Sequence, residues 1–181
     1  MIKHGRITLR HVTDADLPLL ARSANDPEMR GPHTSSRLRS EQQMRKRFQE
    51  TGYSSDEFEK LMICNEAGEA IGDVCHFPAK RYTDAREVGW YLYGPANRGK
   101  GYASEAVTAL VDYLFQNYAI NRIECSTGTD NTPSLKLAER CGFVKEGVAR
   151  GMMFIHGRYV DSAVFSILRS EWVARQAATT R

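Results

Sequence analysis

The sequence predicts a mixed α/β fold built on one central sheet, and three observations point to it. Three β-prone runs, 58–65, 70–77 and 86–93, follow one another with short connections, so we expect antiparallel pairing between them. An amphipathic helix and another strand come next, and this order departs from the regular alternation of a doubly wound sheet. Along the whole chain the patterns predict a sheet of about seven strands flanked by about four helices.

The N-terminal third predicts one strand and two helices. Residues 6–12 alternate apolar and polar side chains, which is the period of a half-buried strand. A helix capped by Thr or Asp follows over 13–25, and the Asp-Pro pair at 26–27 ends it. Residues 28–36 contain glycine and proline and are expected to form a loop, after which a serine caps a polar, strongly basic helix over 41–50.

The second half alternates helices and strands. From residue 104 the apolar side chains recur every three or four positions, which indicates an amphipathic helix of about four turns. A strand over 122–127 and a short helix over 135–140 come next. The chain then returns to strand, and the runs 152–155 and 159–168 predict a hairpin that closes the sheet.

The composition is that of an ordinary globular protein. Of 181 residues, 41% are hydrophobic and 26% charged, so we expect one domain over 1–181, with a core at 6–172 and a polar tail at 173–181. The net charge of +3 is too small to indicate nucleic acid, and no apolar run approaches the ~20 residues of a membrane span. We therefore expect a cytoplasmic protein that binds neither nucleic acid nor membrane.

The four cysteines are widely spaced and form no CxxC pair, so we expect no metal. We interpret them as buried thiols; a nucleophilic role for Cys125 or Cys141 is the alternative.

A glycine-rich segment between the third run and the amphipathic helix predicts an anion site. Its amide groups stand at the positive end of a helix dipole, where phosphate binds. Gly99 and Gly101 let the backbone curl around a pyrophosphate, and Arg98 and Lys100 can neutralise its charge. A plain turn with two solvated cations is the alternative. The spacing fits neither a Walker loop nor a dinucleotide fingerprint, whose third glycine is replaced by Ser104.

These residues resemble the coenzyme A motif of the GCN5-related N-acetyltransferase (GNAT) family, Q/R-x-x-G-x-G/A. Segment 98–103 carries that pattern, and Asn131–Ser134 with Glu139–Phe143 is similar to the family's N-x-x-S/A block and its closing Gly-Phe. The likeness extends over 6–172. The start of the chain and the stretch 157–161 are similar to the ribosomal-protein N-terminal acetyltransferase branch, the RimJ/RimL type, which also contains enzymes that act on antibiotics and other small amines.

The resemblance implies the GNAT fold and acetyl-coenzyme A as cosubstrate, held in a notch where two parallel strands, 86–93 and 122–127, splay apart. In the family, the backbone of the first strand bonds the pantetheine arm, the glycine-rich segment binds the pyrophosphate, and an asparagine lies near the thiol. The cofactor-binding residues carried over to this chain are Tyr91, Leu92, Tyr93, Arg98, Gly99, Lys100, Gly101, Tyr102, Ala103 and Asn131.

Two residues are candidates for proton transfer. Glu87 begins the strand expected to line the cleft, where the resemblance places an acidic base, and a solvated glutamate is the alternative. Ser134 stands where this branch has a serine facing the thiol, and helix capping is its alternative role. The tyrosine acid of many relatives is Ala138 here, and an acidic residue of the ribosomal enzymes aligns with Met153.

His76 is a further candidate, because it lies on a strand beside the predicted cleft and imidazole suits proton transfer; a packed or solvated histidine is the alternative. The basic stretch 37–47 is expected to be a solvated face, with an acidic substrate as the alternative.

The resemblance implies transfer of an acetyl group from acetyl-coenzyme A to a primary amine, such as the N-terminal amine of a ribosomal protein. Two alternatives remain: a small-amine acetyltransferase acting on antibiotics or polyamines, and a nonenzymatic acyl-coenzyme A sensor, which Ala138 and Met153 leave open. Relatives are commonly dimers, so a homodimer is also considered.

Overall fold

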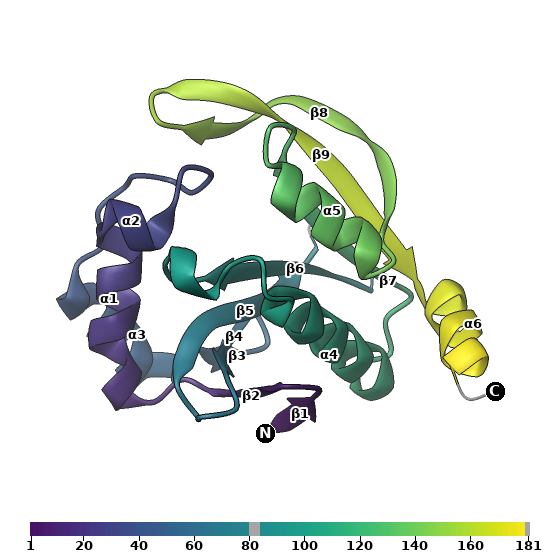
Figure 1. Cartoon of the computed structure of the whole chain (residues 1–181), viewed down its shortest axis with the longest axis horizontal. Helices are drawn as coiled ribbons and strands as arrows, with labels where there is room; N and C mark the ends of the chain where they lie inside the picture. Colours follow the sequence, from purple (N-terminus) through teal and green to yellow (C-terminus); the bar gives the residue numbers. More distant parts are fainter. Residues whose placement is uncertain (80–83, 180–181) are drawn as a thin grey trace.

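The computed structural model describes residues 1–79 and 84–179, and one large sheet with helices on both faces runs through it (Figure 1). Nine strands are present within these residues, in the order β1-β2-β4-β5-β6-β7-β9-β8, with β3 paired to β4. The described neighbours pair antiparallel except β6 and β7, which are parallel. The strands are β1 Ile2–His4, β2 Ile7–His11, β3 Ser54–Ser55, β4 Phe58–Cys64, β5 Ala70–Pro78, β6 Ala85–Leu92, β7 Arg122–Gly128, β8 Val144–Ile155 and β9 Arg158–Leu168.

Six α-helices lie in the described residues: α1 Leu17–Asn25, α2 Pro27–Arg30, α3 Glu41–Thr51, α4 Tyr102–Asn117, α5 Thr132–Arg140 and α6 Arg169–Thr179. Helices α1 to α3 gather on one side of the sheet, and α4 and α5 cover the other (Figure 1). The predicted mixed α/β class is confirmed. The counts of seven strands and four helices were too low, because the short elements β1, β3 and α2 and the C-terminal α6 were missed.

The stretch 28–36, predicted as loop, begins inside helix α2. Asp26 ends α1 and also caps α2, since its carboxylate accepts from the amides of Glu28 at 2.9 Å and Met29 at 3.5 Å. Pro27 occupies the first helical position, where its missing N–H costs nothing. The prediction is therefore wrong as far as Arg30, because the same Asp-Pro pair stops one helix and starts another.

The polar tail predicted after Trp172 continues as helix α6 as far as Thr179. The Trp172 ring packs on Phe115, with centroids 5.4 Å apart, and its Nε1 donates to Asp112 Oδ1 at 2.7 Å. Arg175 donates to the Cys141 carbonyl at 2.7 Å. These contacts to α4 and to the end of α5 order a segment whose own sequence pattern is weak.

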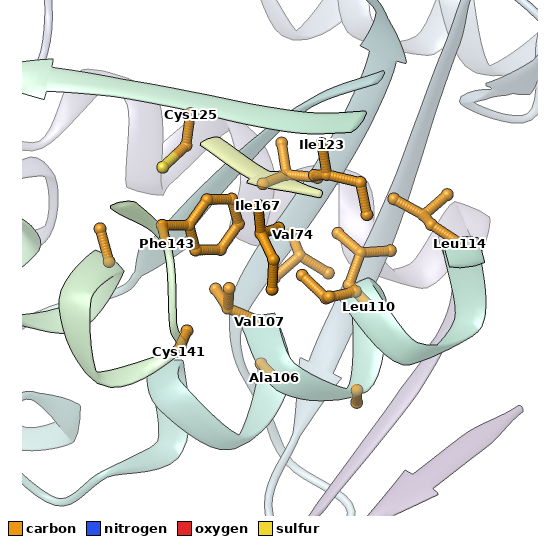
Figure 2. Packing of buried hydrophobic residues seen from close by; sticks show 14 of the residues in the cluster. Val74, Ala106, Val107, Leu110, Leu114, Ile123, Cys125, Cys141, Phe143 and Ile167 are labelled. Atoms are coloured by element: carbon orange, nitrogen blue, oxygen red, sulfur yellow. The ribbon is translucent and has the colours of Figure 1, made fainter. Parts of the chain in front are cut away.

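Two apolar layers hold the sheet between its helices. On the α4 side, Val107, Leu110 and Leu114 interdigitate with strand residues such as Ile123 and Ile167 (Figure 2). On the other side a smaller cluster lies under α1 and α3; its buried members are Val12, Leu17, Leu20, Tyr53, Met62, Cys64 and Tyr93. Because strand residues alternate between faces, β4 and β6 each contribute side chains to both layers.

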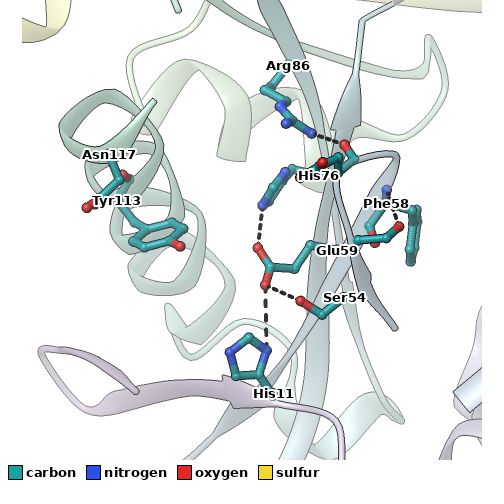
Figure 3. A network of polar contacts seen from close by, with 10 residues as sticks. His11, Ser54, Phe58, Glu59, His76, Arg86, Tyr113 and Asn117 are labelled. Carbon is teal, nitrogen blue, oxygen red and sulfur yellow. Dashed lines mark hydrogen bonds and ion pairs between the residues drawn. The ribbon is translucent and has the colours of Figure 1, made fainter. Parts of the chain in front are cut away.

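One polar pair is buried in the α4 layer (Figure 3). His76 is 1% exposed, and its Nε2 lies 2.8 Å from Glu59 Oε2. Glu59 Oε1 accepts from the Ser54 hydroxyl at 3.0 Å and lies 3.6 Å from His11 Nδ1. The hydrogen bond from His76, with a further contribution from Ser54, lowers the pKa of Glu59 below its ordinary 4.5. Glu59 is therefore held as a carboxylate in the core.

We predict that Glu59→Gln lowers the free energy of unfolding at pH 7 by about 2 kcal/mol, the scale of a hydrogen bond to a charged group. The folded-state pKa of Glu59 is depressed, so its contribution is present above pH 4.5 and is lost as the pH falls through the folded-state pKa. The free energies of unfolding of the variant and the wild type, measured with urea between pH 7 and pH 4, should differ less below pH 4.5. A difference independent of pH, or an equal loss in the exposed control Glu57→Gln, contradicts this.

Candidate functional site

The parallel strands β6 and β7 separate after a short paired stretch. Their register joins Ala85–Glu87 to Arg122–Glu124 and extends no further, although β6 continues to Leu92 and β7 to Gly128. The unpaired parts leave a notch in the sheet, which is the splay that the resemblance implied. Its two walls are the C-terminal parts of the two strands, after Glu87 in β6 and after Glu124 in β7.

Glu87 lies at the apex of this notch. It is the last residue of β6 paired with β7, and the Ser126 hydroxyl donates to its Oε1 at 3.1 Å across the two strands. Its register partner Glu124 accepts from Arg122 Nε at 2.5 Å, which neutralises a neighbouring carboxylate. By the strand alternation, Glu87 shares its sheet face with Gly89 and with the α1 to α3 side.

A cavity of about 550 Å³ opens on that face. Its floor belongs to β4, β5 and β6, where Asp73, Cys75 and Gly89 line it, and its walls come from α1 to α3 and the loop between α2 and α3. Asp73 accepts from Lys60 Nζ and from the Tyr93 hydroxyl, each at 2.6 Å. Burial, and then Asp73, raises the pKa of Cys75 to about 11, so this thiol is protonated at neutral pH.

The sequence predictions missed Asp73 and Lys60 as site residues. The sequence did contain a sign that Asp73 has a special role, because it is a charged residue within the mostly apolar strand predicted over 70–77.

The glycine-rich segment lies between the notch and the start of α4. Gly99 and Gly101 have φ of +75° and +91°, the left-handed region that favours glycine. Gly101 is the N-cap of α4. Because glycine has no side chain, it cannot cap the amide groups of the first turn. A Cβ added to Gly99 would meet nothing within 4 Å, so space for an anion is open there. The phosphate site itself stays a prediction.

Arg6, which the sequence predictions did not include, supports this segment from the β1–β2 turn. It donates from Nε to Glu105 Oε1 at 2.9 Å and from its amide to Oε2 at 2.7 Å. Its Nη2 also donates to the Lys100 carbonyl at 2.7 Å. Glu105 stands in the first turn of α4, and Arg6 neutralises a carboxylate that would otherwise repel an anionic ligand. No local pattern could reveal a pair 99 residues apart.

Arg98 connects the glycine-rich segment to the end of α2. Its Nη2 donates to the Met29 carbonyl at 2.9 Å, and the same carbonyl accepts from the amide of Gly94 at 3.1 Å. The guanidinium also lies against Gly31, where an added Cβ would be 3.0 Å from both Nη atoms. Lys100 is exposed. Arg98 thus has a structural contact with the end of α2 in addition to its predicted role.

Asn131 and Ser134 lie where α5 begins, next to the other wall of the notch. Asn131 Oδ1 accepts from the Ser134 amide at 3.4 Å, and its Nδ2 donates to Thr127 Oγ1 at 3.1 Å. Asn131 is thus the helix cap, and α5 starts at Thr132, earlier than predicted. Ala138, at the position of the missing tyrosine, is fully buried.

Tyr91, Leu92 and Tyr93 form the β6 wall of the notch. The Tyr93 amide donates to the Ile71 carbonyl at 2.9 Å and therefore faces β5. Because backbone groups alternate in direction along a strand, those of Leu92 face the notch. The Tyr91 hydroxyl donates to carbonyl oxygens of α1 and α2 at 3.2 Å. Burial raises the pKa of Tyr91 to about 12.

The other candidates lie elsewhere. His76 is packed on the α4 face with Glu59, which confirms the alternative of a packed histidine; strand alternation directs its side chain away from the cavity that β5 borders (Figure 3). Cys125 and Cys141 are buried, and burial raises the pKa of both thiols, which removes the thiolate needed for a nucleophile. Among residues 1–79 and 84–179, no His, Cys, Asp and Glu group has a metal-binding arrangement, and no helix has the length and apolarity to cross a membrane.

Comparison with known proteins agrees with this geometry. The family model of the acetyltransferase (GNAT) domain matches residues 6–144. The uncharacterized N-acetyltransferase p20 of Bacillus licheniformis is 35% identical over 171 residues, covering 92% of this chain and 95% of that protein. The [ribosomal protein uS5]-alanine N-acetyltransferase of Escherichia coli is 33% identical over 82 residues, 45% of this chain and 42% of that protein.

A solved structure also shares the fold. The spermidine N-acetyltransferase from Vibrio cholerae, in complex with CoA and spermine, superposes with a TM-score of 0.80. The identity is 22%, and the match covers 93% of this chain and 98% of that one.

We predict that Arg6→Gln weakens coenzyme A binding about two- to fivefold at low salt, because Glu105 then places an unbalanced charge at the start of α4. The double variant Arg6→Gln with Glu105→Gln should recover most of the affinity. Calorimetric titration of coenzyme A measures both. The control Lys3→Gln removes an exposed cation from the neighbouring strand β1. If it weakens coenzyme A binding as much as Arg6→Gln does, the loss comes from the overall charge and not from the Arg6–Glu105 ion pair.

Proposed function

The chain belongs to the GNAT acetyltransferase family and is an N-acetyltransferase, and we propose that it transfers the acetyl group of acetyl-coenzyme A to a primary amine through Glu87. The observation that carries this is the position of Glu87, at the apex of the notch and on the sheet face that carries the cavity. The partial likeness to the uS5-alanine enzyme supports the RimJ/RimL-type branch, and with it a protein N-terminus as one acceptor class. Small amines are the other class.

Acetyl-coenzyme A fits the groups on both sides of the notch. We assign the pyrophosphate to Gly99, Gly101 and the first-turn amides of Tyr102 and Ala103, with Lys100 as counter-charge. The backbone of Leu92 would hold the pantetheine arm on the β6 wall, and Asn131 borders the arm from the β7 wall. Tyr91 and Tyr93 shape this wall through their side chains, and Arg98 fixes the segment against α2.

The chemistry needs two proton transfers. The amine nitrogen attacks the thioester carbonyl carbon, and the proton it loses goes to the Glu87 carboxylate, directly or through a water. The C–S bond then breaks, and the sulfur takes a proton from the Ser134 hydroxyl, which lies beyond β7 at the start of α5; Ser134 regains a proton from solvent, and Glu87 releases one to solvent. The hydroxyl of Ser126 orients Glu87 by its hydrogen bond at 3.1 Å. With Ala138 buried, Ser134 takes the role that a tyrosine has in relatives.

We predict that Gly99→Val abolishes measurable acetyl-coenzyme A binding, because a branched side chain fills the open space beside the helix start. The matched control is Gly68→Val in the β4–β5 turn, where φ is +81° and an added Cβ also meets nothing within 4 Å. Both substitutions place a side chain in the left-handed region and should lose a similar stability, about 1–2 kcal/mol. Equal affinity in the two variants would argue against the assigned pyrophosphate site.

We predict that Glu87→Gln lowers turnover roughly 10- to 1000-fold with little change in acetyl-coenzyme A affinity, since an amide cannot accept the proton. The rate should recover as the pH approaches the acceptor's own pKa, where free amine forms without a base. Ser134→Ala should show no such recovery. Release of free thiol, followed from pH 6 to 10, tests this; the control is Glu124→Gln, opposite Glu87 but bound to Arg122. Wild-type turnover of Glu87→Gln at neutral pH and saturating acceptor places the base elsewhere.

A further inference from the structure

We infer that the acceptor amine also carries an anionic group, and that it is a small amino-carboxylate of about amino-acid size; this rests on the proposed function. The basis is the charge of the acceptor cavity. Five cationic residues and one carboxylate, Asp73, are among the described residues that line it. The cations are Arg30, Arg37, Arg39, Arg47 and Lys60.

The single carboxylate is already satisfied by the protein. Asp73 is 5% exposed and accepts from Lys60 Nζ and the Tyr93 hydroxyl, each at 2.6 Å. This uses one of the five cations and both carboxylate oxygens. Four arginines therefore remain around the cavity with no carboxylate bound to them in the part of the chain that the structure describes.

Arg30 is the strongest member of this set. It is 8% exposed, and its Nη1 donates to the Ala24 carbonyl at a long 3.3 Å. Its Nε is buried and lacks a hydrogen-bond partner among the described residues. A buried guanidinium without a counter-charge is costly, so the site is built for a group that supplies one. A carboxylate bound in the cavity would supply the missing counter-charge.

The cations of helix α3 differ between its two sides: those away from the cavity form ion pairs, and the one beside the cavity forms none within the described residues. Arg45 donates to Asp14 at 2.7 Å and to Glu41 at 3.3 Å, and Lys46 lies 3.9 Å from Glu50. These cations do not line the cavity. Arg47, on the cavity side, instead stacks over the Tyr53 and Phe58 rings and has no ion pair within the described residues. Arg37, Arg39 and Arg47, which lie in the stretch expected to be a solvated face, are exposed and also line the cavity.

The cavity dimensions favour a small acceptor. A volume of about 550 Å³ lies within the range of small-molecule sites. The loop after α2 contributes Thr34 and Ser35 to its wall, and the tip of the β8–β9 hairpin contacts the same loop, since His156 Nε2 lies 3.1 Å from the Pro32 carbonyl. A polyamine would instead place several positive charges among the arginines, which repel it.

The test compares amines that differ in one charge. Free thiol is followed with acetyl-coenzyme A and each of the twenty amino acids, the carboxamide of each, spermidine, and short peptides with free N-termini. We expect the best acceptor to carry a free carboxylate, and its carboxamide to have a kcat/KM about 10- to 100-fold lower, the loss expected for a charge-assisted hydrogen bond. Added salt should raise KM for the carboxylate acceptor more than for the carboxamide.

The outcomes separate the two proposals. Preference for spermidine or for carboxamides overturns the anionic acceptor and leaves acetyl transfer in place. Preference for peptides overturns the small acceptor and supports a protein N-terminus. If acetyl-coenzyme A binds but no amine of any class is acetylated, the proposed function itself fails.

Substitutions of single arginines test which residues recognise the carboxylate of the acceptor. Arg30→Gln removes the charge but keeps a polar side chain, and should raise KM for the carboxylate acceptor about 10- to 100-fold while leaving KM for its carboxamide within about twofold. Arg39→Gln, exposed and tolerant of substitution, should give a smaller change in the same direction. Lys46→Gln is the control, since it removes a cation from the outer side of α3. Thermal unfolding checks each fold, and equal KM changes for both acceptors in Arg30→Gln and Arg39→Gln contradict the assignment.

Discussion

The early separation of β6 and β7 is the constraint on which the rest of the site depends. Two strands that stop pairing midway leave backbone groups without sheet partners, which is costly unless something else holds the strands. Here each strand is held from its outer side, because β5 pairs with β6 from Arg86 to Leu92 and β9 pairs with β7 from Arg122 to Gly128. The notch is therefore a stable feature of the sheet, and its open edges can be satisfied by a ligand.

The same separation determines where charge is needed. Helix α4 follows β6 after the segment 93–101, which contains the glycine-rich turn, and Arg6 and Arg98 bring the β1–β2 turn and the end of α2 to this segment. On the α1 to α3 face of the sheet, Arg30 and its neighbours give the cavity a second positive region.

The sequence predicted those parts of the fold that local patterns specify. Helix α4 has a strong periodicity, the β-prone runs of β4, β5 and β6 are separated by short connections, and the turn at Gly99 and Gly101 has a backbone requirement that can be recognised from the residues. The elements α2 and α6 were missed because their stability comes from contacts with α1 and α4, which no local pattern records.

For the site, the sequence predicted the anion segment and placed Glu87 on the strand that forms the notch. It could not pair Arg6 with Glu105 or Lys60 with Asp73, since such pairs depend on which strands become neighbours. The sheet face of His76 could not be predicted for a related reason: a strand whose residues are buried on both sides gives no alternation from which to tell its faces apart. Arg30 was hidden in a stretch predicted as loop.

The way the cavity is divided along the chain bears on how such enzymes diverge. Its floor is part of the sheet that also forms the notch, whereas its walls belong to α1, α2, α3 and the loop at 31–40. Substitutions in the walls can alter which amine is accepted without touching the residues assigned to the acetyl donor. A lineage that keeps residues 85–134 and varies residues 17–53 could therefore acquire new acceptors while its catalytic chemistry stays the same.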